Sequence, residues 1–198
     1  MTFVEGFYSF NLELTDTDRD RYARVRVKVP RHPHESFEHL YGRVLAWLHC
    51  YEPGQEFTRG LFEPKEPTIW RRDVIGALLL WVQLGCPDRQ KLQRALRESA
   101  GEVRVYFYEP GQVEALCHML RGSTTNWVEP VRFYHLDPEL LAALAGHPVS
   151  SSSWQATFVD GQLYLVVDGR EYSSSVEPVD IWARYQESLL AGSVPEGG

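Results

Sequence analysis

The chain enters its first predicted helix through the sequence Arg31-His32-Pro33-His34-Glu35-Ser36-Phe37-Glu38. Glu35 and Glu38 are three positions apart, and residues with this spacing lie on one face of a helix. Their carboxylates can therefore point at one spot, as the ligands of a metal site for phosphodiester hydrolysis must. The alternative is that both acids simply favour the positive end of the helix macrodipole.

An amphipathic pattern follows and predicts a helix over about residues 34–50. Its apolar residues recur at the spacing of a helix with one buried face: Phe37, Leu40, Tyr41, Val44, Trp47, Leu48 and Tyr51. Ser36 is a suitable N-cap for this helix. Glu38 borders the apolar face, where a partly sheltered carboxylate requires a partner or a metal to stay charged.

The rest of the chain predicts a mixed α/β (α+β) domain, in which helices flank a central mixed sheet. We expect strands at 4–14, 24–29, 57–62, 103–107 and 131–136, helices at 88–99, 112–121 and 138–145, and a C-terminal β-hairpin of 154–158 and 162–167 followed by a short strand at 171–174. Residues 75–84 are almost wholly apolar and suit a central strand buried on both faces.

Length and composition are ordinary for a globular protein of 198 residues, 43% of them hydrophobic and 24% charged. We expect one domain over residues 1–192 and a frayed tail at 193–198. The three cysteines, Cys50, Cys86 and Cys117, form no CxxC pair, so neither a disulfide framework nor a cysteine zinc site is indicated. The N-terminus lacks a signal-peptide pattern and no apolar run is long enough for a bilayer, which predicts a cytoplasmic protein.

The charge is unevenly distributed. The formal net charge is −7, and this whole excess lies in residues 137–198. Within the balanced remainder, Arg24, Arg26 and Lys28 alternate with valines along a predicted strand. These three cations, the basic stripe, could bind nucleic-acid phosphates or could form the solvated face of a strand that protects a sheet edge. A chain with a negative net charge does not bind nucleic acid non-specifically over its whole surface, so any such contact has to be local.

Several spaced segments carry a family resemblance. They are Arg31-His32-Pro33-x-Glu35-x-x-Glu38, Arg43-Val44-Leu45-Ala46-Trp47, Phe57-Thr58-Arg59-Gly60-Leu61, Glu66-Pro67-x-x-Trp70-x-x-Asp73-x-x-Gly76 and Trp81-Val82-Gln83-Leu84-Gly85-x-Pro87-Asp88. Together they resemble the bacterial YaeQ family, which is functionally uncharacterised, over nearly the whole chain. The resemblance implies a variant of the PD-(D/E)xK nuclease-like fold, whose core has the order helix–strand–strand–strand–helix–strand.

The same resemblance implies a set of site residues. In active nucleases of that superfamily, carboxylates hold magnesium and a lysine orients the attacking water. The helix acid would be Glu35 or Glu38, with Glu38 preferred because it borders the core; Asp73 would be the principal Mg²⁺ ligand. Gln83 stands where the superfamily usually has a glutamate, and an amide supplies no negative charge for the metal. Gly85 stands where the lysine is required, so Lys91 would have to align the water and Arg94 would clamp phosphate.

Geometry limits this assignment. If residues 73–83 formed one straight strand, Asp73 and Gln83 would be about 33 Å apart. They can share a metal only if the chain reverses near residues 74–77, where Gly76 permits a turn; otherwise Glu66 becomes the better partner for Glu38. Two hypotheses remain: a magnesium-dependent nuclease, or a catalytically inactive nuclease fold that binds nucleic acid or protein.

Overall fold

The structure is a computed structural model that describes residues 6–191. Within these residues ten strands form one sheet, accompanied by five α-helices and a short 3-10 helix, η1 (Gly60–Phe62). The strands are β1 (Gly6–Asp16), β2 (Arg21–Arg31), β3 (Gln55–Phe57), β4 (Ile69–Arg72), β5 (Leu78–Leu84), β6 (Ser99–Phe107), β7 (Val131–Leu136), β8 (Ser151–Val159), β9 (Gln162–Val167) and β10 (Arg170–Pro178). The helices are α1 (Phe37–His49), α2 (Arg89–Glu98), α3 (Gln112–Met119), α4 (Pro138–Ala145) and α5 (Ile181–Ala191).

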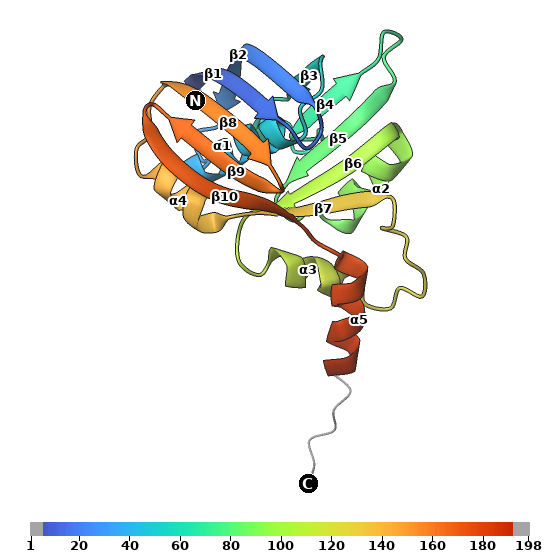
Figure 1. The fold of residues 1–198 in the computed structure, drawn as a ribbon. Coiled ribbons are helices and arrows are strands. Elements are labelled where there is room, and N and C mark those ends of the chain that lie inside the picture. Colours follow the sequence, from blue (N-terminus) through green and yellow to red (C-terminus); the bar gives the residue numbers. More distant parts are fainter. Residues whose placement is uncertain (1–5, 192–198) are drawn as a thin grey trace.

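The sheet has the strand order β2-β1-β8-β9-β10-β7-β6-β5-β4-β3. The pairs β1–β8, β5–β6 and β6–β7 are parallel and the others are antiparallel. Strand β10 joins two halves of the sheet, because its first part pairs with β9 and its last part with β7. Figure 1 shows the two halves diverging from this junction, with β2 to β10 on one side and β7 to β3 on the other.

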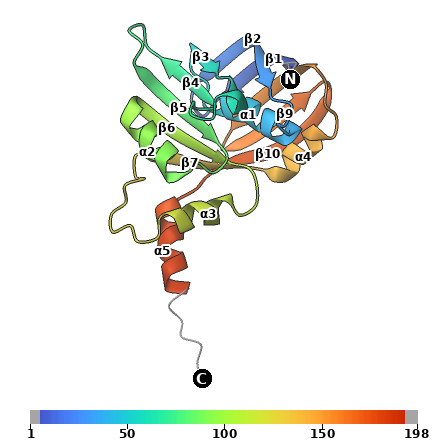
Figure 2. The same cartoon turned by 180° about the vertical axis from the view of Figure 1, so that it is seen from behind.

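Helix α1 lies at the centre of the molecule, on the inner side of both sheet halves (Figure 2). Its nine consecutive residues 40–48 are all buried, whereas an ordinary surface helix buries only one stripe. A Cβ on Gly42 would lie 3.0 Å from the Leu84 side chain, so the missing side chain lets α1 approach β5 closely. The helix packs with β1, β5, β8 and α4 in one hydrophobic cluster.

A second cluster lies on the other side of the β5–β7 half. Trp81, Val105 and Phe107 face α2, α3 and α5 there, and Ile181 and Tyr185 of α5 contribute to the same core. Strand β5 thus has Leu80, Val82 and Leu84 in the first cluster and Leu78 and Trp81 in the second. The predicted central strand buried on both faces is therefore confirmed over residues 78–84.

The predicted strand at 75–84 nevertheless starts too early. Val74 and Ile75 are apolar but almost fully exposed, because they form the turn between β4 and β5. Asp73 stabilises this turn, since its Oδ1 accepts from the backbone N–H groups of Ile75 (3.0 Å) and Ala77 (2.8 Å). Gly76 adopts a φ of +89°, which favours glycine. The chain therefore reverses at residues 73–77, where the sequence permitted a turn but did not require one.

Most other elements agree with the sequence to within a few residues, and the mixed α/β class and the C-terminal hairpin are confirmed. Helix α1 starts three residues later than predicted, at Phe37, because Ser36 caps it. Residues 57–62 are not a strand but the end of β3 and the 3-10 helix. Helix α5 was not predicted, and residues 4–5 and 193–198 lie outside the described residues. No described helix is long and apolar enough to cross a membrane.

Candidate functional site

Glu35 is part of a buried charge cluster and does not face solvent. Only 1% of its surface is exposed. Its Oε1 lies 2.6 Å from His39 Nδ1 and 3.2 Å from Arg43 Nη1, while Oε2 accepts from the backbone N–H of His32 at 3.1 Å. Burial raises the pKa of Glu35, but the His39 hydrogen bond and the Arg43 charge outweigh it, so the pKa lies below its ordinary value. This carboxylate is occupied by protein groups.

Arg43 joins three separate segments through its guanidinium, which is fully buried. Besides Glu35, it donates to the carbonyl oxygens of Pro30 (2.8 Å) and Thr58 (3.2 Å). Gly60 packs against it, since a Cβ there would lie 3.1 Å from the guanidinium carbon. The Arg31–Glu38 and Phe57–Leu61 motifs therefore meet at this one arginine. Their contacts indicate a role in holding the end of β2, the start of α1 and η1 together.

Glu38 is half-buried on the flank of α1, as its position at the border of the apolar face predicted. It lies near Tyr108: burial is the largest cause that raises the pKa of this tyrosine, and the charges of Glu109, Glu35 and Glu38 add to it. Tyr108 also lies 3.7 Å from where a Cβ on Gly85 would be. Among the described residues, Glu38 has no ion pair, so it is the acid of the helix that remains available.

Asp73 lies at the tip of the β4–β5 hairpin, where its carboxylate accepts the two turn hydrogen bonds. Gln83 lies near the opposite end of β5. Because Asp73 pairs with Ala77 across the turn, six residues of extended strand, about 20 Å, separate it from Gln83. The predicted reversal occurs, yet it does not bring these two side chains together.

Gln83 itself has an unusual environment. Its Nε2 donates to the Leu84 carbonyl at 2.6 Å, while its Oε1 is buried without a hydrogen-bond partner among the described residues. Thr68, just before β4, hydrogen-bonds to the two residues on either side of Gln83. Thr68 donates its N–H to Val82 at 2.7 Å and accepts from the Leu84 N–H through Oγ1 at 3.0 Å. Neither neighbour supplies a negative charge beside the amide.

Lys91 and Arg94 lie on α2, which starts from the N-cap Asp88. Burial lowers the pKa of Lys91 to about 8, while Asp88 opposes this shift and Arg94 adds to it. Arg94 pairs with Glu98, with 2.7 Å between Nε and Oε1. Burial thus shifts the pKa of Lys91 in the direction that a reactive lysine needs. Arg94, in contrast, is already paired with an acid of its own helix.

These placements do not fit a magnesium site made of Glu38, Asp73 and Gln83. Asp73 is separated from Gln83 by most of a strand, and Glu35 is consumed by Arg43 and His39. Over residues 6–191, no group of three or more His, Cys, Asp or Glu side chains is arranged to hold a metal ion. The catalytic roles of these residues and Mg²⁺ as a cofactor stay predictions, because the structure does not bring Asp73 and Gln83 together in one site.

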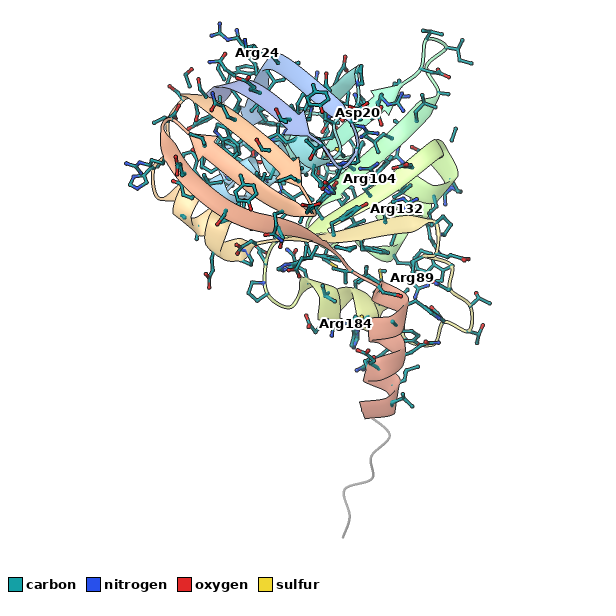
Figure 3. The ribbon with its side chains drawn as sticks, viewed as in Figure 1. Asp20, Arg24, Arg89, Arg104, Arg132 and Arg184 are labelled. Atoms are coloured by element: carbon teal, nitrogen blue, oxygen red, sulfur yellow. The ribbon has the colours of Figure 1, made fainter. Side chains whose placement is uncertain are left out.

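The basic stripe has a different setting. Arg24, Arg26 and Lys28 lie on β2, at the edge of the sheet, and all three side chains point to solvent while Val25, Val27 and Val29 point inward. Figure 3 shows Arg24 projecting from this edge. Arg24 Nη2 lies 2.7 Å from Glu13 on β1, an exposed pair. Within the described part of the chain, no ion pair involves Arg26 or Lys28.

The neighbouring arginines of the same basic region are engaged inside the molecule. Arg19 pairs with Asp16 and donates to the His49 carbonyl. Arg21 pairs with Glu52, and Arg31 donates to the Glu35 carbonyl and lies over the Phe37 ring at 4.2 Å. Of the cations between residues 19 and 31, only the stripe faces outward as a group.

The stripe borders a broad uncovered surface. In Figure 1 the strands β2, β1, β8, β9 and β10 lie in front, and α1 and α4 cover only their far side. The strand register aligns the outward side chains of these strands in rows. We call the surface that the rows form the open sheet face. The rows are Tyr22–Thr15–Thr157–Tyr164–Ser173, Arg24–Glu13–Gln155–Val166–Glu171, Arg26–Asn11–Ser153 and Lys28–Ser9–Ser151. Alternation within each strand could identify these residues, but only the pairing of β1 with β8 unites them.

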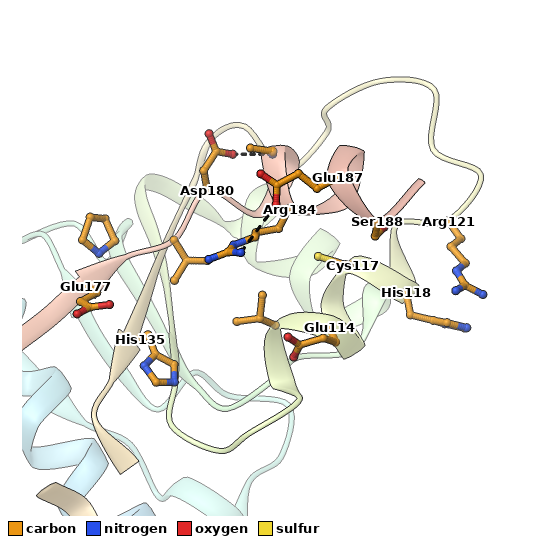
Figure 4. Close-up of a pocket in the computed structure, with 14 residues that line it drawn as sticks. Glu114, Cys117, His118, Arg121, His135, Glu177, Asp180, Arg184, Glu187 and Ser188 are labelled. Atoms are coloured by element: carbon orange, nitrogen blue, oxygen red, sulfur yellow. Dashed lines mark hydrogen bonds and ion pairs between the residues drawn. The ribbon is translucent and has the colours of Figure 1, made fainter. Parts of the chain in front are cut away.

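A groove between α3 and α5 has a volume of about 1090 Å³ (Figure 4). Acidic and basic side chains alternate along it, including Glu114, Glu177, Arg121 and Arg184, and the Arg184–Glu187 pair crosses its α5 side. His135 and Glu177 face each other there from β7 and β10. None of the residues predicted for a functional site lines this groove.

Comparison with known proteins places the chain in a family. The family model described as "YaeQ protein" matches residues 1–176. The uncharacterized protein YaeQ of Escherichia coli is 29% identical over 168 residues, covering 85% of this chain and 92% of the relative; that of Salmonella typhi is 28% identical, covering 83% and 90%.

Solved structures agree. The crystal structure of the YaeQ protein from Xanthomonas axonopodis has a TM-score of 0.81 at 26% identity and covers 88% of this chain and 98% of that one. The corresponding structure from Pseudomonas syringae has a TM-score of 0.79 at 24% identity, with coverages of 89% and 96%. The family match over nearly the whole chain, with the same fold in both crystal structures, shows that this protein is a member of the YaeQ family.

Proposed function

We propose that this protein binds single-stranded nucleic acid through the open sheet face and does not cut it. The observation that carries the proposal is the position of the basic stripe, three outward cations along the edge of an uncovered polar sheet. Proteins that bind single strands combine a positively charged track for the backbone with aromatic side chains on which bases stack. The open sheet face has both components.

The aromatic component consists of Tyr22 and Tyr164, which stand in the same cross-strand row. Their exposed fractions are 63% and 52%, so their rings are available to a ligand. Stacking of a base on an aromatic ring contributes about 1–3 kcal/mol. The side chains between and beside these tyrosines are mainly Ser, Thr, Asn and Gln, which can donate to and accept from base edges.

The phosphate component consists of Arg26 and Lys28. Both are exposed, and neither has to leave an acidic partner within residues 6–191 to meet a phosphate. Arg24 would have to exchange Glu13 for the ligand, so it contributes less. The net charge of −7 opposes non-specific binding of polyanions. Binding should therefore be confined to this face and weaken as salt rises.

The separation of two predicted metal ligands supports the part of the proposal that excludes cleavage. Hydrolysis of a phosphodiester by bound metal requires acidic ligands that converge on the ion. Asp73 and Gln83 lie at opposite ends of β5, no group of three acidic, histidine or cysteine side chains within residues 6–191 could hold a metal, and glycine occupies position 85. A nucleic-acid binder with this geometry is expected to leave its ligand intact.

The test uses fluorescence anisotropy with labelled single-stranded DNA and RNA of about 12 nucleotides, the length one binding face accommodates. The double variant Arg26→Glu with Lys28→Glu removes the stripe's free cations. We expect its affinity to fall at least about tenfold and its salt dependence to become shallower by about one to two in slope. Incubation of the wild type with millimolar magnesium should leave the labelled strands intact.

A matched control reverses two exposed cations elsewhere, Lys65→Glu with Arg97→Glu, which changes the net charge equally. This control should bind within about twofold of the wild type. If the wild type binds no single strand, or if the two double variants lose affinity equally, the open sheet face is not a nucleic-acid site. Loss caused equally by both pairs would mean that only net charge matters.

A further inference from the structure

A small cavity lies at the end of the sheet where β9 turns into β10. Its volume is about 190 Å³. Tyr41 of α1, Trp154 of β8 and Tyr172 of β10 supply aromatic walls, and Leu144 of α4 also lines the cavity. Its polar groups include His147, Asp168 of the β9–β10 turn and Arg170 at the start of β10. The cavity is separate from every residue predicted for catalysis.

The size of the cavity restricts its ligand to one flat group. An apolar protein cavity of about 150 Å³ holds a benzene ring. A cavity of 190 Å³ therefore accommodates a single planar heterocycle, and the sugar and phosphate of a nucleotide would remain outside it. Aromatic walls favour such a ligand, because flat rings stack or pack edge to face on them.

Asp168 gives the cavity a defined hydrogen-bonding edge. Its Oδ2 accepts from the Ser152 hydroxyl at 2.7 Å and its Oδ1 from the Ser153 N–H at 2.8 Å. Ser152 is 4% exposed and also accepts from Trp154 Nε1 at 2.9 Å, so the orientation of the carboxylate is fixed from within the core. An ionised carboxylate has about four acceptor positions, so each oxygen can still accept a further bond.

Arg170 decides between two kinds of ligand that would suit aromatic walls and a carboxylate. An organic cation would be attracted by both, yet it would also be repelled by the guanidinium two residues from Asp168. A neutral planar ring with two adjacent N–H donors has no such conflict. Among the four bases, only guanine presents two neighbouring donors on its pairing edge, N1–H and the N2 amino group.

We propose that this cavity is a guanine-binding pocket in which Asp168 accepts from N1–H and N2–H while Tyr172 packs on the ring. The assignment rests on the proposed function, because it gives the open sheet face a base-selective end. Asp168 joins the two surfaces directly: Ser153, bonded to Oδ1, belongs to the open sheet face and receives a bond from Asn11 at 3.3 Å, whereas Ser152, bonded to Oδ2, lines the cavity.

The test is calorimetric titration with guanosine monophosphate, using adenosine monophosphate to subtract any effect of the sugar and phosphate. Inosine monophosphate lacks only the N2 amino group and should bind about five- to tenfold more weakly than the guanosine compound, the loss of one hydrogen bond to a charged group. Asp168→Asn should lower the affinity for guanosine monophosphate at least about tenfold and so remove the preference over adenosine monophosphate, because the amide replaces one acceptor by a donor. Asn tolerates the φ of +49° at this position, so the variant should fold.

A second variant tests the cavity without touching Asp168. Val149, 43% exposed at the cavity, is replaced by Trp to fill the space, and this should also remove guanosine binding. Equal affinity for guanosine and adenosine monophosphate, or an unchanged guanine preference in Asp168→Asn, would reject the guanine-binding pocket. Neither result would contradict oligonucleotide binding by the basic stripe, which the anisotropy experiment tests separately. Guanosine binding that depends on Asp168, with no binding of any single strand, would establish the pocket and reject the proposed function.

Discussion

Thr68, not Asp73, lies beside Gln83, because its N–H donates to the Val82 carbonyl at 2.7 Å and its Oγ1 accepts from the Leu84 N–H at 3.0 Å. The register of the β4–β5 ladder pairs Ile69 with Val82. The hairpin therefore places a buried threonine where a second acidic ligand would be needed, and it carries Asp73 to the far end. A tight turn at residues 73–77 produces this result, since it separates positions ten apart in sequence by nearly the full strand.

Replacing Asp73 should affect the hairpin and not metal binding. Asp73→Ala removes an acceptor from two backbone N–H groups in an exposed turn, so we expect a loss of about 1 kcal/mol in unfolding free energy. Magnesium titration by calorimetry should give the same trace for the variant and the wild type. Magnesium binding by the wild type that disappears in Asp73→Ala would instead establish a metal site at this residue.

The Glu35–Arg43 pair should be among the largest single contributions to stability. Glu35→Ala leaves a buried guanidinium without its counter-charge, and breaking a buried pair in this way costs about 3–5 kcal/mol. Glu38→Ala, three positions further along the chain at a half-buried site in the first turn of α1, is the matched control and should cost less than about 1 kcal/mol. Urea unfolding of both variants decides the matter, and equal losses would show that the pair is not a structural centre.

The same pair predicts a pH dependence with a definite sign. The pKa of Glu35 is lowered on folding, so its ionised form stabilises the native state. That stabilisation is complete above the ordinary pKa of 4.5 and is lost as pH falls through the lower, folded-state pKa. The difference in unfolding free energy between wild type and Glu35→Gln should thus stay constant at neutral pH and shrink as the pH falls below 4.5. A difference that also stays constant below pH 4.5 would contradict the assignment.

Gly60 tests the packing around Arg43 independently of charge. Gly60 has a φ of +61°, and a Cβ there would lie 3.1 Å from the guanidinium. Gly54 also has a positive φ, +84°, but a Cβ there meets nothing within 4 Å. Both Ala variants incur the left-handed backbone cost of about 1–2 kcal/mol, so the additional loss in Gly60→Ala, expected to be about 1 kcal/mol or more, reports the contact with Arg43. Equal melting temperatures for the two variants would show that Arg43 gives way freely.

The sequence predicted the local elements because their signals are local. The apolar spacing of α1, the caps at Ser36 and Asp88, and the Asp160-Gly161 turn each specify a helix or hairpin within a few residues. The same signals could not show that α1 is buried on all sides, since residues such as Gly42 and Arg43 look like a polar face. The burial of Arg43 depends on Glu35 and two carbonyl groups from distant segments, which accept from its two terminal nitrogens.

The functional surfaces depend on pairings that no local pattern encodes. Val74 and Ile75 extend an apolar run, and only the turn hydrogen bonds of Asp73 place them in solvent. The basic stripe was identified from alternation in β2, but its polar neighbours come from β8 and β9, more than a hundred residues later. The sequence did not identify Asp168 as a site residue, because this turn residue acquires its partner Ser152 only when the sheet forms.

Lys91 provides the last test, and its sign is opposite to that of Glu35. Burial lowers the pKa of Lys91 from 10.5 to about 8, so its charged form destabilises the native state. This penalty is fully present below pH 8 and is relieved as pH rises towards 10.5, where the unfolded chain also loses the proton. Lys91→Met should therefore raise the unfolding free energy by about 1–3 kcal/mol at pH 7, and this gain should diminish between pH 8 and 10. Denaturation of both proteins across that range measures it; a variant less stable than the wild type at pH 7 would mean that the Lys91 ammonium has a compensating partner and a pKa near its ordinary value.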